Sequence, residues 1–157
     1  TILGLSSLLL KTQDITQIME LASRGNISNI DLQIQDISKK PLPGLPLSAT
    51  ASNFGKVRNL VSDEDIAAGI INMVLQVIGK SAILSSLNSN INNFVMTGNL
   101  AKFPQCKGIF RSLETMFQVH FIIPDQAEYG TAIGAALTEE RHMEMRQILY
   151  PSDNNPL

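Results

Sequence analysis

The residues that most directly suggest ligand chemistry form a glycine turn after a short apolar segment. Residues 94–96 have the length and composition of a buried strand, and Thr97-Gly98-Asn99 suits a tight turn. Pro104 suits the first turn of a following helix, where its missing N–H costs nothing. A strand, a glycine turn and a helix in this order let the backbone approach a ligand at the carboxyl edge of a sheet. Such turns more often only connect two elements, so this one names no ligand.

Other reactive side chains are sparse. His120 and His142 are the only histidines, and neither has a cysteine, histidine or carboxylate at metal-ligand spacing. Cys106 has no histidine near it in sequence, so we expect a buried and inert thiol. Glu128 could face a cleft, but a solvated carboxylate is the commoner case. The sequence also has neither a nucleophile elbow nor a Walker-type phosphate loop. The residue types therefore predict no metal site and do not identify a reaction.

Composition indicates a folded protein of one domain. The chain has 157 residues, 44% hydrophobic and 17% charged, with a net charge of −2, which fits a globular class and gives no nucleic-acid-binding signature. A single cysteine is compatible with a reducing cytosol, and no uninterrupted apolar run nears the roughly 20 residues that span a bilayer. We therefore expect a cytoplasmic protein without nucleic-acid or membrane partners. Since the chain starts inside an apolar run without methionine, we also expect it to be the back part of a longer protein.

Apolar residues at helical spacing predict five helices. The first starts at the beginning of the chain, and the second begins at Asp14, which forms a capping box with Gln17, and ends at Gly25. A long helix begins at Ser62 and ends before Asn88, with an apolar stripe wide enough for a mainly buried element. The remaining two helices include residues 109–117 and 130–146, the latter with a small-residue face suited to close contact. Within the long helix, Gly69 and Gly79 weaken the helix but permit close packing.

The segments between the helices contain the predicted strands and loops. Alternation over 32–37 suggests a short extended segment, and three prolines with a glycine predict a loop and candidate lid over 39–46. Residues 49–56 have no decisive period; the simplest interpretation is a surface connection that packs Phe54 inward. Residues 119–123 read as a strand ended by Pro124. The order helix, strand, helix, strand, helix from Ser62 onward favours an α/β layer over a helical bundle.

Six stretches in register resemble the C-terminal half of a type II pantothenate kinase, from Thr1 to about Leu137. They are Gly4-Leu5 with Leu8-Leu9, Leu21-Ala22-Ser23-Arg24-Gly25, Ile30-Asp31-Leu32 with Asp36-Ile37, Thr50-Ala51-Ser52-Asn53-Phe54-Gly55, Thr97-Gly98-Asn99, and Tyr129-Gly130-Thr131-Ala132-Ile133-Gly134-Ala135.

The resemblance implies a fold and an activity. That family belongs to the actin, heat-shock ATPase and sugar-kinase superfamily, with two ribonuclease-H-like lobes around an ATP cleft. Residues 1–157 would be the C-terminal lobe, a mixed sheet flanked by helices, with 138–157 as a helix end and frayed tail. The activity would be the ATP-dependent phosphorylation of pantothenate to 4′-phosphopantothenate in coenzyme A synthesis. The protein would act as a homodimer, with Mg²⁺ held through the ATP phosphates and with acyl-coenzyme A as a candidate feedback ligand.

The resemblance also assigns ATP contacts. Thr1 and Ile2 match the end of a phosphate loop and would offer backbone amides at a helix start. Ile15 matches a position that is usually aromatic and packs on adenine; isoleucine supplies apolar cover without stacking. Gly98 and Asn99 match a nucleotide-contacting turn. The family's catalytic glutamate and first phosphate loop lie in the N-terminal lobe, so no catalytic residue is expected in this chain.

The substrate contacts come from other segments. Thr50 and Ala51 match residues that line the pantothenate pocket from the partner subunit, and Phe117 matches an aromatic of that pocket within about one residue. Two alternatives stay open: another kinase of the superfamily, such as an N-acetylglucosamine kinase-like protein, or a non-catalytic lobe that binds acyl-coenzyme A or mediates dimerisation. The stretch Thr50 to Gly55 favours pantothenate over a sugar.

Overall fold

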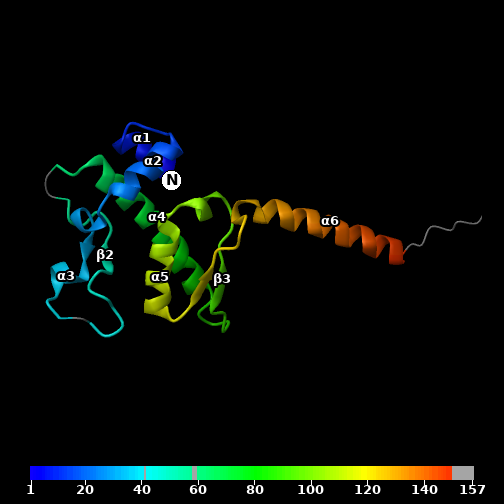
Figure 1. Cartoon of the computed structure of the whole chain (residues 1–157). Helices are drawn as coiled ribbons and strands as arrows, with labels where there is room; N and C mark the ends of the chain where they lie inside the picture. Colours follow the sequence, from blue (N-terminus) through cyan, green and yellow to red (C-terminus); the bar gives the residue numbers. More distant parts are fainter. Residues whose placement is uncertain (41, 58–59, 150–157) are drawn as a thin grey trace, which may run out of the picture. The chain divides into compact units, whose positions relative to one another are not determined.

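A computed structural model describes residues 1–40, 42–57 and 60–149, the last four by backbone alone (Figure 1). The chain divides into two units, which are considered separately. The first comprises Thr1–Val95 with Phe103–Ile122, and the second comprises Met96–Lys102 with Ile123–Leu157. The tail that the sequence predicts to be frayed lies outside the described residues from position 150 onward.

The first unit is built around the long helix α4 (Asp63–Ser85), which contacts α1 (Ile2–Leu9), α2 (Ile15–Arg24) and α5 (Gln105–Phe117) (Figure 1). The predicted start is confirmed, since the Ser62 hydroxyl accepts a hydrogen bond from the Asp65 N–H at 3.2 Å. The helix ends before Asn88, as predicted. Its fully buried residues include Ile70, Ile71 and Leu75, so α4 supplies the centre of the hydrophobic core.

Two glycines let neighbouring elements approach α4 closely, as the sequence predicts. A Cβ at Gly69 would lie 3.1 Å from Ile30 Cγ2 and 3.2 Å from Phe54 Cζ. A Cβ at Gly79 would collide with Leu113 Cδ1 and lie 3.2 Å from Phe110 Cε1. The helix propensity lost at each glycine is offset by core contacts that a larger residue would block.

Helix α2 begins and ends where the sequence predicts, but its end has another physical cause. Asp14 Oδ1 accepts hydrogen bonds from the N–H groups of Thr16 and Gln17, at 2.9 and 3.4 Å. Gly25 has φ −77°, so it does not end the helix in the left-handed conformation typical of glycine. A Cβ there would instead collide with the backbone carbonyl of Glu64. Glycine is required by the contact with α4 and not by the turn.

The first sheet pairs β1 (Leu32–Gln33) with β2 (Thr50–Ser52) in antiparallel register. The predicted extended segment over 32–37 is wrong beyond Gln33, because Ile34–Ile37 forms the short helix α3. Asp36 Oδ2 accepts a hydrogen bond from the Gln33 N–H at 2.9 Å, which closes the helical turn. The described residues of the 39–46 loop form turns with a Leu42–Leu45 bridge, and Phe54 packs inward as predicted.

The second sheet pairs β3 (Asn93–Val95) with β4 (His120–Ile122) in parallel, with α5 as the crossover between them. Phe121 stacks on both Phe94 and Phe110, with ring centroids 5.3 and 4.6 Å apart. The alternation of helix and strand from α4 onward is confirmed. The predicted burial of 94–96 is wrong, since Val95 is 62% exposed. In the described residues each strand has only one partner strand, so every strand there is an edge strand.

The architecture is therefore mixed α/β, but it comprises two two-stranded sheets in the described residues instead of the single mixed sheet expected of a ribonuclease-H-like lobe. The short 3₁₀ turn Ile27–Asn29 (η1) joins α2 to the first sheet and contacts α4. The α/β class is confirmed, and the specific lobe stays a prediction.

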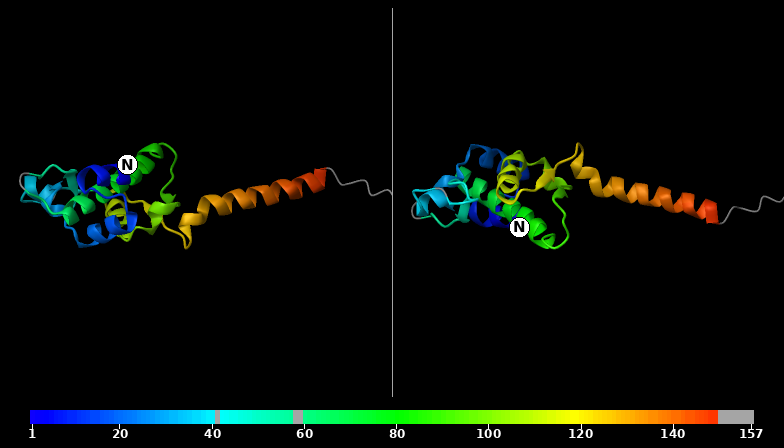
Figure 2. Two further views of the ribbon diagram at one scale, coloured as in Figure 1. Left: turned by 90° about the horizontal axis from the view of Figure 1, so that it is seen from above. Right: turned by 90° about the horizontal axis from the view of Figure 1, so that it is seen from below.

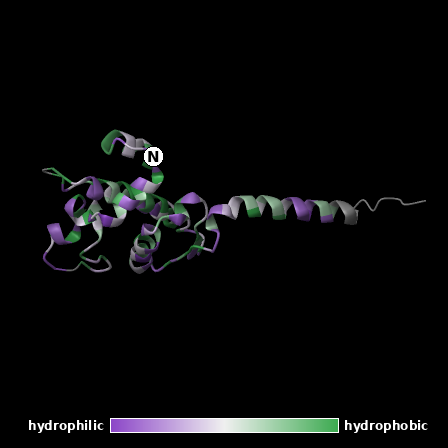
Figure 3. Cartoon of the chain, turned by 45° about the horizontal axis from the view of Figure 1, so that its top comes forward, coloured by the Kyte–Doolittle hydropathy of each residue, from purple (hydrophilic) through white to green (hydrophobic). Residues whose placement is uncertain are grey.

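The second unit contains two 3₁₀ turns, η2 (Asn99–Lys102) and η3 (Ala127–Tyr129), and the helix α6 (Gly130–Leu149), drawn from two opposite sides in Figure 2. The Gly98 N–H donates to the Ala127 carbonyl at 2.8 Å, and Lys102 pairs with Glu128 at 3.1 Å. The small-residue face, which the sequence predicts to contact a sheet or a nucleotide, packs on no sheet within the described unit: residues 131–145 are all exposed, with polar and apolar residues interspersed (Figure 3). Its contact with a nucleotide stays a prediction.

One helix among the described residues, α4, is long and apolar enough to cross a membrane by length and composition. The sequence criterion of an uninterrupted apolar run missed it because polar residues such as Asp65 and Asn72 interrupt the run. Both of these side chains are buried and hydrogen-bonded within the unit. Half of the most apolar window is buried, which is typical of the core helix of a globular unit.

Replacing Gly25 with alanine tests the contact between α2 and α4. The new methyl group has no room beside the Glu64 carbonyl, and overpacking of this kind costs about 1–3 kcal/mol. Gly108→Ala is the matched control, because a Cβ at this helical glycine meets nothing within 4 Å and alanine gains up to about 1 kcal/mol of helix propensity. Urea denaturation measures the unfolding free energy of both variants. Equal effects of Gly25→Ala and Gly108→Ala on this free energy would contradict the packing argument.

Candidate functional site

The most densely hydrogen-bonded group in the first unit is the carboxylate of Asp31, which is 0% exposed. Its Oδ1 accepts a hydrogen bond from the Phe54 N–H at 2.8 Å. Its Oδ2 accepts from the side chains of Asn72 at 2.7 Å, and of Thr50 and Asn53, both at 3.3 Å. A buried carboxylate is tolerated only when its oxygens are satisfied in this way. Asp31 therefore ties β2 and the turn after it to the middle of α4.

Local sequence explains how the donors reach Asp31. Asp31 directly precedes β1, and Thr50 begins the strand that pairs with β1. Phe54 adopts a left-handed φ of +57° in the turn after β2, which aims its N–H at the carboxylate while its ring packs against Gly69. A non-glycine residue is held at positive φ only where surrounding contacts offset its strain.

A line of polar side chains runs from Asp31 along one face of α4. Asn72 Oδ1 accepts a hydrogen bond from Gln76 Nε2 at 3.1 Å, and Gln76 Oε1 accepts one from Lys80 Nζ at 2.8 Å. The three residues are four positions apart, so they lie on one helical face. We call Asp31, Asn72, Gln76 and Lys80 the polar relay.

The three α4 residues of the relay, Asn72, Gln76 and Lys80, form part of the wall of a cavity of about 550 Å³. Thr50 and Ala51 of β2 line this cavity, and so does Phe117 at the end of α5. These are the three residues that the family resemblance assigns to the pantothenate pocket, with Thr50 and Ala51 contributed by the partner subunit. Here a single chain brings all three to one cavity, and the contribution from a partner subunit stays a prediction. The other lining residues are Ile27, Gln33, Ile34, Leu45, Ser48, Ala49, Asn72, Gln76, Lys80, Gly108, Ile109, Ser112, Leu113 and Met116.

The cavity lining combines two kinds of groups. The polar relay residues of α4 and the hydroxyl of Thr50 supply hydrogen-bonding groups. Helix α5 supplies apolar groups, with Ile109, Met116 and Phe117 on one helical face. An apolar wall with a few convergent polar groups is the usual composition of a small-molecule site.

The residues predicted to contact ATP are distributed over both units, and none of them lines the cavity described above. Thr1 is the N-cap of α1 and makes no side-chain capping bond, while Ile2 is buried. Ile15 begins α2 and is 39% exposed. Gly98 has φ +92° and Asn99 begins η2, and both belong to the second unit.

Three other carboxylates are held in structural contacts. Burial opposes ionisation of Asp65, but hydrogen bonds from the Asn26 N–H and the Asn29 amide outweigh it and lower the pKa of the carboxyl. A hydrogen bond from Lys56 lowers the pKa of Asp36. The pKa of the Glu128 carboxyl is lowered by hydrogen bonds from the Glu128 backbone N–H and from Lys102. Within the described residues, no group of three histidine, cysteine or acidic side chains is arranged to hold a metal ion.

Cys106 lies on α5 and is buried, as predicted. Burial raises the pKa of its thiol from 9.0 to about 11. A thiol of this kind is a poor nucleophile at neutral pH, so the prediction that Cys106 is chemically inert is supported.

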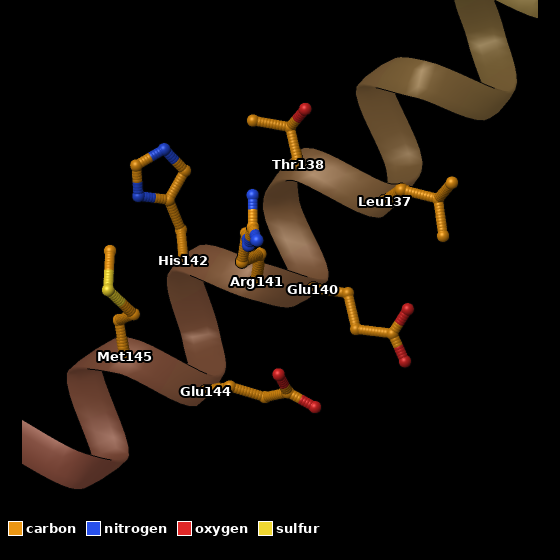
Figure 4. A pocket seen from close by; sticks show the side chains of 7 residues that line it. All are labelled: Leu137, Thr138, Glu140, Arg141, His142, Glu144 and Met145. Carbon is orange, nitrogen blue, oxygen red and sulfur yellow. The ribbon is translucent and has the colours of Figure 1, made fainter.

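A second hollow, of about 610 Å³, lies beside α6 and is no candidate site. All seven of its lining residues come from that one helix, and their side chains project outward from it (Figure 4). His142, Arg141 and Glu144 are exposed, so no second element of the described unit encloses them. A site needs groups that converge from more than one direction.

The sequence interpretation missed the polar relay. Asp31 was part of a family-like stretch without a role, and Asn72, Gln76 and Lys80 were hidden within the apolar stripe of α4. The available signal was their spacing of four residues in a helix that is otherwise nearly apolar. Such spacing predicts one shared face, but it does not indicate a buried carboxylate at its end.

Comparisons with known proteins agree on one group of relatives. A family model described as Fumble matches residues 1–113. Pantothenate kinase 1 of Oryza sativa subsp. japonica is 36% identical over 105 residues, which is 62% of this chain and 16% of the relative. The type II pantothenate kinase of Oceanobacillus iheyensis is 36% identical over 85 residues, 53% of this chain and 31% of the relative.

A third relative carries a different name. The 4′-phosphopantetheine phosphatase of Mus musculus is 38% identical over 89 residues, which is 54% of this chain and 11% of the relative. Each of these alignments covers less than a third of the relative's own length.

Asp31→Ala tests the hydrogen-bond cluster. The substitution leaves the Phe54 N–H and the Asn72 amide without their acceptor, and unsatisfied buried polar groups cost about 1–3 kcal/mol each. We expect a loss of about 2–5 kcal/mol in the unfolding free energy. Glu140→Ala, on the exposed part of α6, is the control and should change it little. Similar unfolding midpoints for the two variants in urea would contradict the role of Asp31.

The reactivity of Cys106 can be measured by alkylation. A pKa about two units above the ordinary 9.0 lowers the thiolate fraction near neutral pH about 100-fold. We expect iodoacetamide to label the native protein at least about 100-fold more slowly than the urea-unfolded protein. The native rate should rise about tenfold per pH unit up to the pKa. Native labelling as fast as unfolded labelling at pH 7 would show that the thiol is not buried.

Proposed function

This chain belongs to the Fumble family and contains a region like that of type II pantothenate kinases; from that premise we propose that it is the C-terminal lobe of an ATP-dependent pantothenate kinase. The supporting observation is the cavity between β2 and α5, which Thr50, Ala51 and Phe117 line together. In this proposal the cavity takes pantothenate, and the lobe contributes to a homodimer. The relatives' names support a role in coenzyme A synthesis.

The proposed ATP contacts are compatible with the local structure. The N–H groups in the first turn of α1 receive no side-chain cap from Thr1, and uncapped N–H groups at a helix start bind phosphate well. Ile15 is exposed enough to cover an adenine ring. By the same resemblance, Gly98 and Asn99 contact the nucleotide, and a Cβ at Gly98 would meet nothing within 4 Å.

In the proposed reaction this lobe orients the reactants. ATP supplies the phosphoryl group, with Mg²⁺ neutralising its phosphates, and a base outside these 157 residues activates the substrate hydroxyl. Phosphoryl transfer depends on positioning and charge neutralisation more than on covalent catalysis by the protein. The cavity residues would hold the substrate so that its hydroxyl faces the phosphate, and the apolar α5 wall would exclude water.

Two other activities need direct assay. The phosphatase relative suggests 4′-phosphopantetheine as a substrate for hydrolysis, and the superfamily resemblance suggests N-acetylglucosamine as an acceptor. The full-length protein should form product from pantothenate and ATP, without dephosphorylating 4′-phosphopantetheine or phosphorylating the sugar. Binding of acyl-coenzyme A without turnover of any of the three compounds would replace the kinase proposal with the non-catalytic one.

Ala51→Trp tests the assignment of the cavity. Ala51 lines the cavity and is exposed to it, so an indole there would occupy the space proposed for pantothenate. We expect the KM for pantothenate to rise about tenfold or more, equivalent to about 1.4 kcal/mol of lost binding, with the KM for ATP nearly unchanged. Val57→Trp, at an exposed position that does not line the cavity, is the control. If Ala51→Trp leaves the KM for pantothenate at the wild-type value, this cavity is not the substrate site.

A further inference from the structure

We propose that Lys80 is the anion-binding residue of the cavity and that it binds the carboxylate of a monocarboxylic acid. The proposal rests on the proposed function for the choice of pantothenate as the natural acid, but its physical basis is the polar relay alone. The relay determines that the side chain at position 80 must donate a hydrogen bond, and it leaves further N–H groups of that side chain for a ligand.

The direction of the relay follows from its first member. A carboxylate only accepts hydrogen bonds, so Asn72 must turn its NH₂ group toward Asp31. The Asn72 oxygen then faces away and requires a donor, which Gln76 supplies with its own NH₂ group at 3.1 Å. The Gln76 oxygen in turn requires a donor, and Lys80 Nζ lies 2.8 Å from it. The buried Asp31 therefore orients both amides, so the side chain at position 80 must donate a hydrogen bond to the Gln76 oxygen. A carboxylate could not do so.

Lys80 has bonding capacity to spare. Its ammonium carries three N–H donors, and one is accounted for by Gln76. Within the part of the chain that the structure describes, no carboxylate oxygen lies within 4.0 Å of Lys80 Nζ. Lys56 and Lys102, in contrast, each form an ion pair with a carboxylate. The side chain is half-buried and lines the cavity. A tethered cation with donors left over at a cavity wall is suited to bind an anionic ligand group.

The rest of the cavity limits the class of ligand. Besides the relay residues, the α5 residues Ile109, Met116 and Phe117 line the cavity, and they favour a carbon chain over a second charge. Among the described residues that line the cavity, Lys80 is the one with a cationic side chain, and none has an acidic side chain. One charge and one apolar wall match an acid with a single carboxylate and a body with apolar surface. A neutral amide of the same shape would lose the charge-assisted hydrogen bond and should bind more weakly.

The experiment compares an acid with its amide in the full-length protein. Hexanoate and hexanamide serve as probes, and the methyl NMR signal of Met116, labelled in its methyl group, reports occupancy of the cavity. Pantothenate and its primary amide are compared in parallel by calorimetry. Lys80→Gln keeps a donor for Gln76 but removes the charge. Lys107→Gln is the matched control, because Lys107 lies on the exposed side of α5 and does not line the cavity.

We expect the wild-type protein to bind each acid more tightly than its amide. Lys80→Gln should weaken acid binding about 10- to 100-fold, as removal of a charged hydrogen-bond partner does, and should change amide binding less than about threefold. Lys107→Gln should change neither. Acids and amides that bind alike, a Lys80→Gln variant that weakens both equally or neither, or an absence of Met116 shifts with hexanoate would overturn the inference.

The same measurements separate this inference from the kinase proposal. If the full-length protein does not phosphorylate pantothenate but hexanoate still shifts Met116 in a Lys80-dependent way, the kinase proposal fails and the anion site stands. If pantothenate is phosphorylated with the same KM in wild type and Lys80→Gln, and its binding is equally unaffected, the kinase proposal stands and the anion site is wrong.

Discussion

The buried carboxylate of Asp31 is the interaction on which the first unit depends. It accepts hydrogen bonds from the Phe54 backbone and from the side chains of Thr50, Asn53 and Asn72, so one side chain joins the first sheet, the turn after it and α4. A carboxylate removed from water is costly unless its oxygens are fully bonded. The sheet therefore has one preferred position on α4, and with it β2 acquires its place on the cavity wall.

Close packing of α4 provides the complementary constraint. Gly69 admits Ile30 and Phe54, Gly79 admits Leu113 and Phe110, and the ring stack of Phe110 with Phe121 extends the core from α5 to the parallel strands. The residues that weaken α4 as an isolated helix are thus the ones that let it become the centre of the unit. Leu113, which packs against Gly79, also lines the cavity, so this contact helps to position the α5 wall of the cavity.

Local sequence signals predicted the elements well where a side chain caps its own helix. Asp14 and Ser62 begin α2 and α4 through hydrogen bonds within three residues, and such bonds need no tertiary partner. Prediction failed where distant contacts decide the outcome. The alternating pattern at 32–37 resembled a strand, but Asp36 closes a helical turn onto the Gln33 N–H. Residues 94–96 read as buried from their apolarity, whereas burial depends on which strands and helices cover them, and Val95 is mostly exposed.

For the candidate site, sequence alone determined the helix starts, the α/β alternation and the family, because capping, periodicity and short motifs are local properties of the chain. The resemblance also assigned Thr50, Ala51 and Phe117 to one pocket, with the first two contributed by a partner subunit. Only the tertiary structure decided that a single chain brings these residues to one cavity and that Asp31 orients a relay ending in Lys80. Residues 31 and 80 are joined through two amides whose direction is set by a buried charge. That direction arises only when the first sheet packs on α4, so no pattern along the chain contains it.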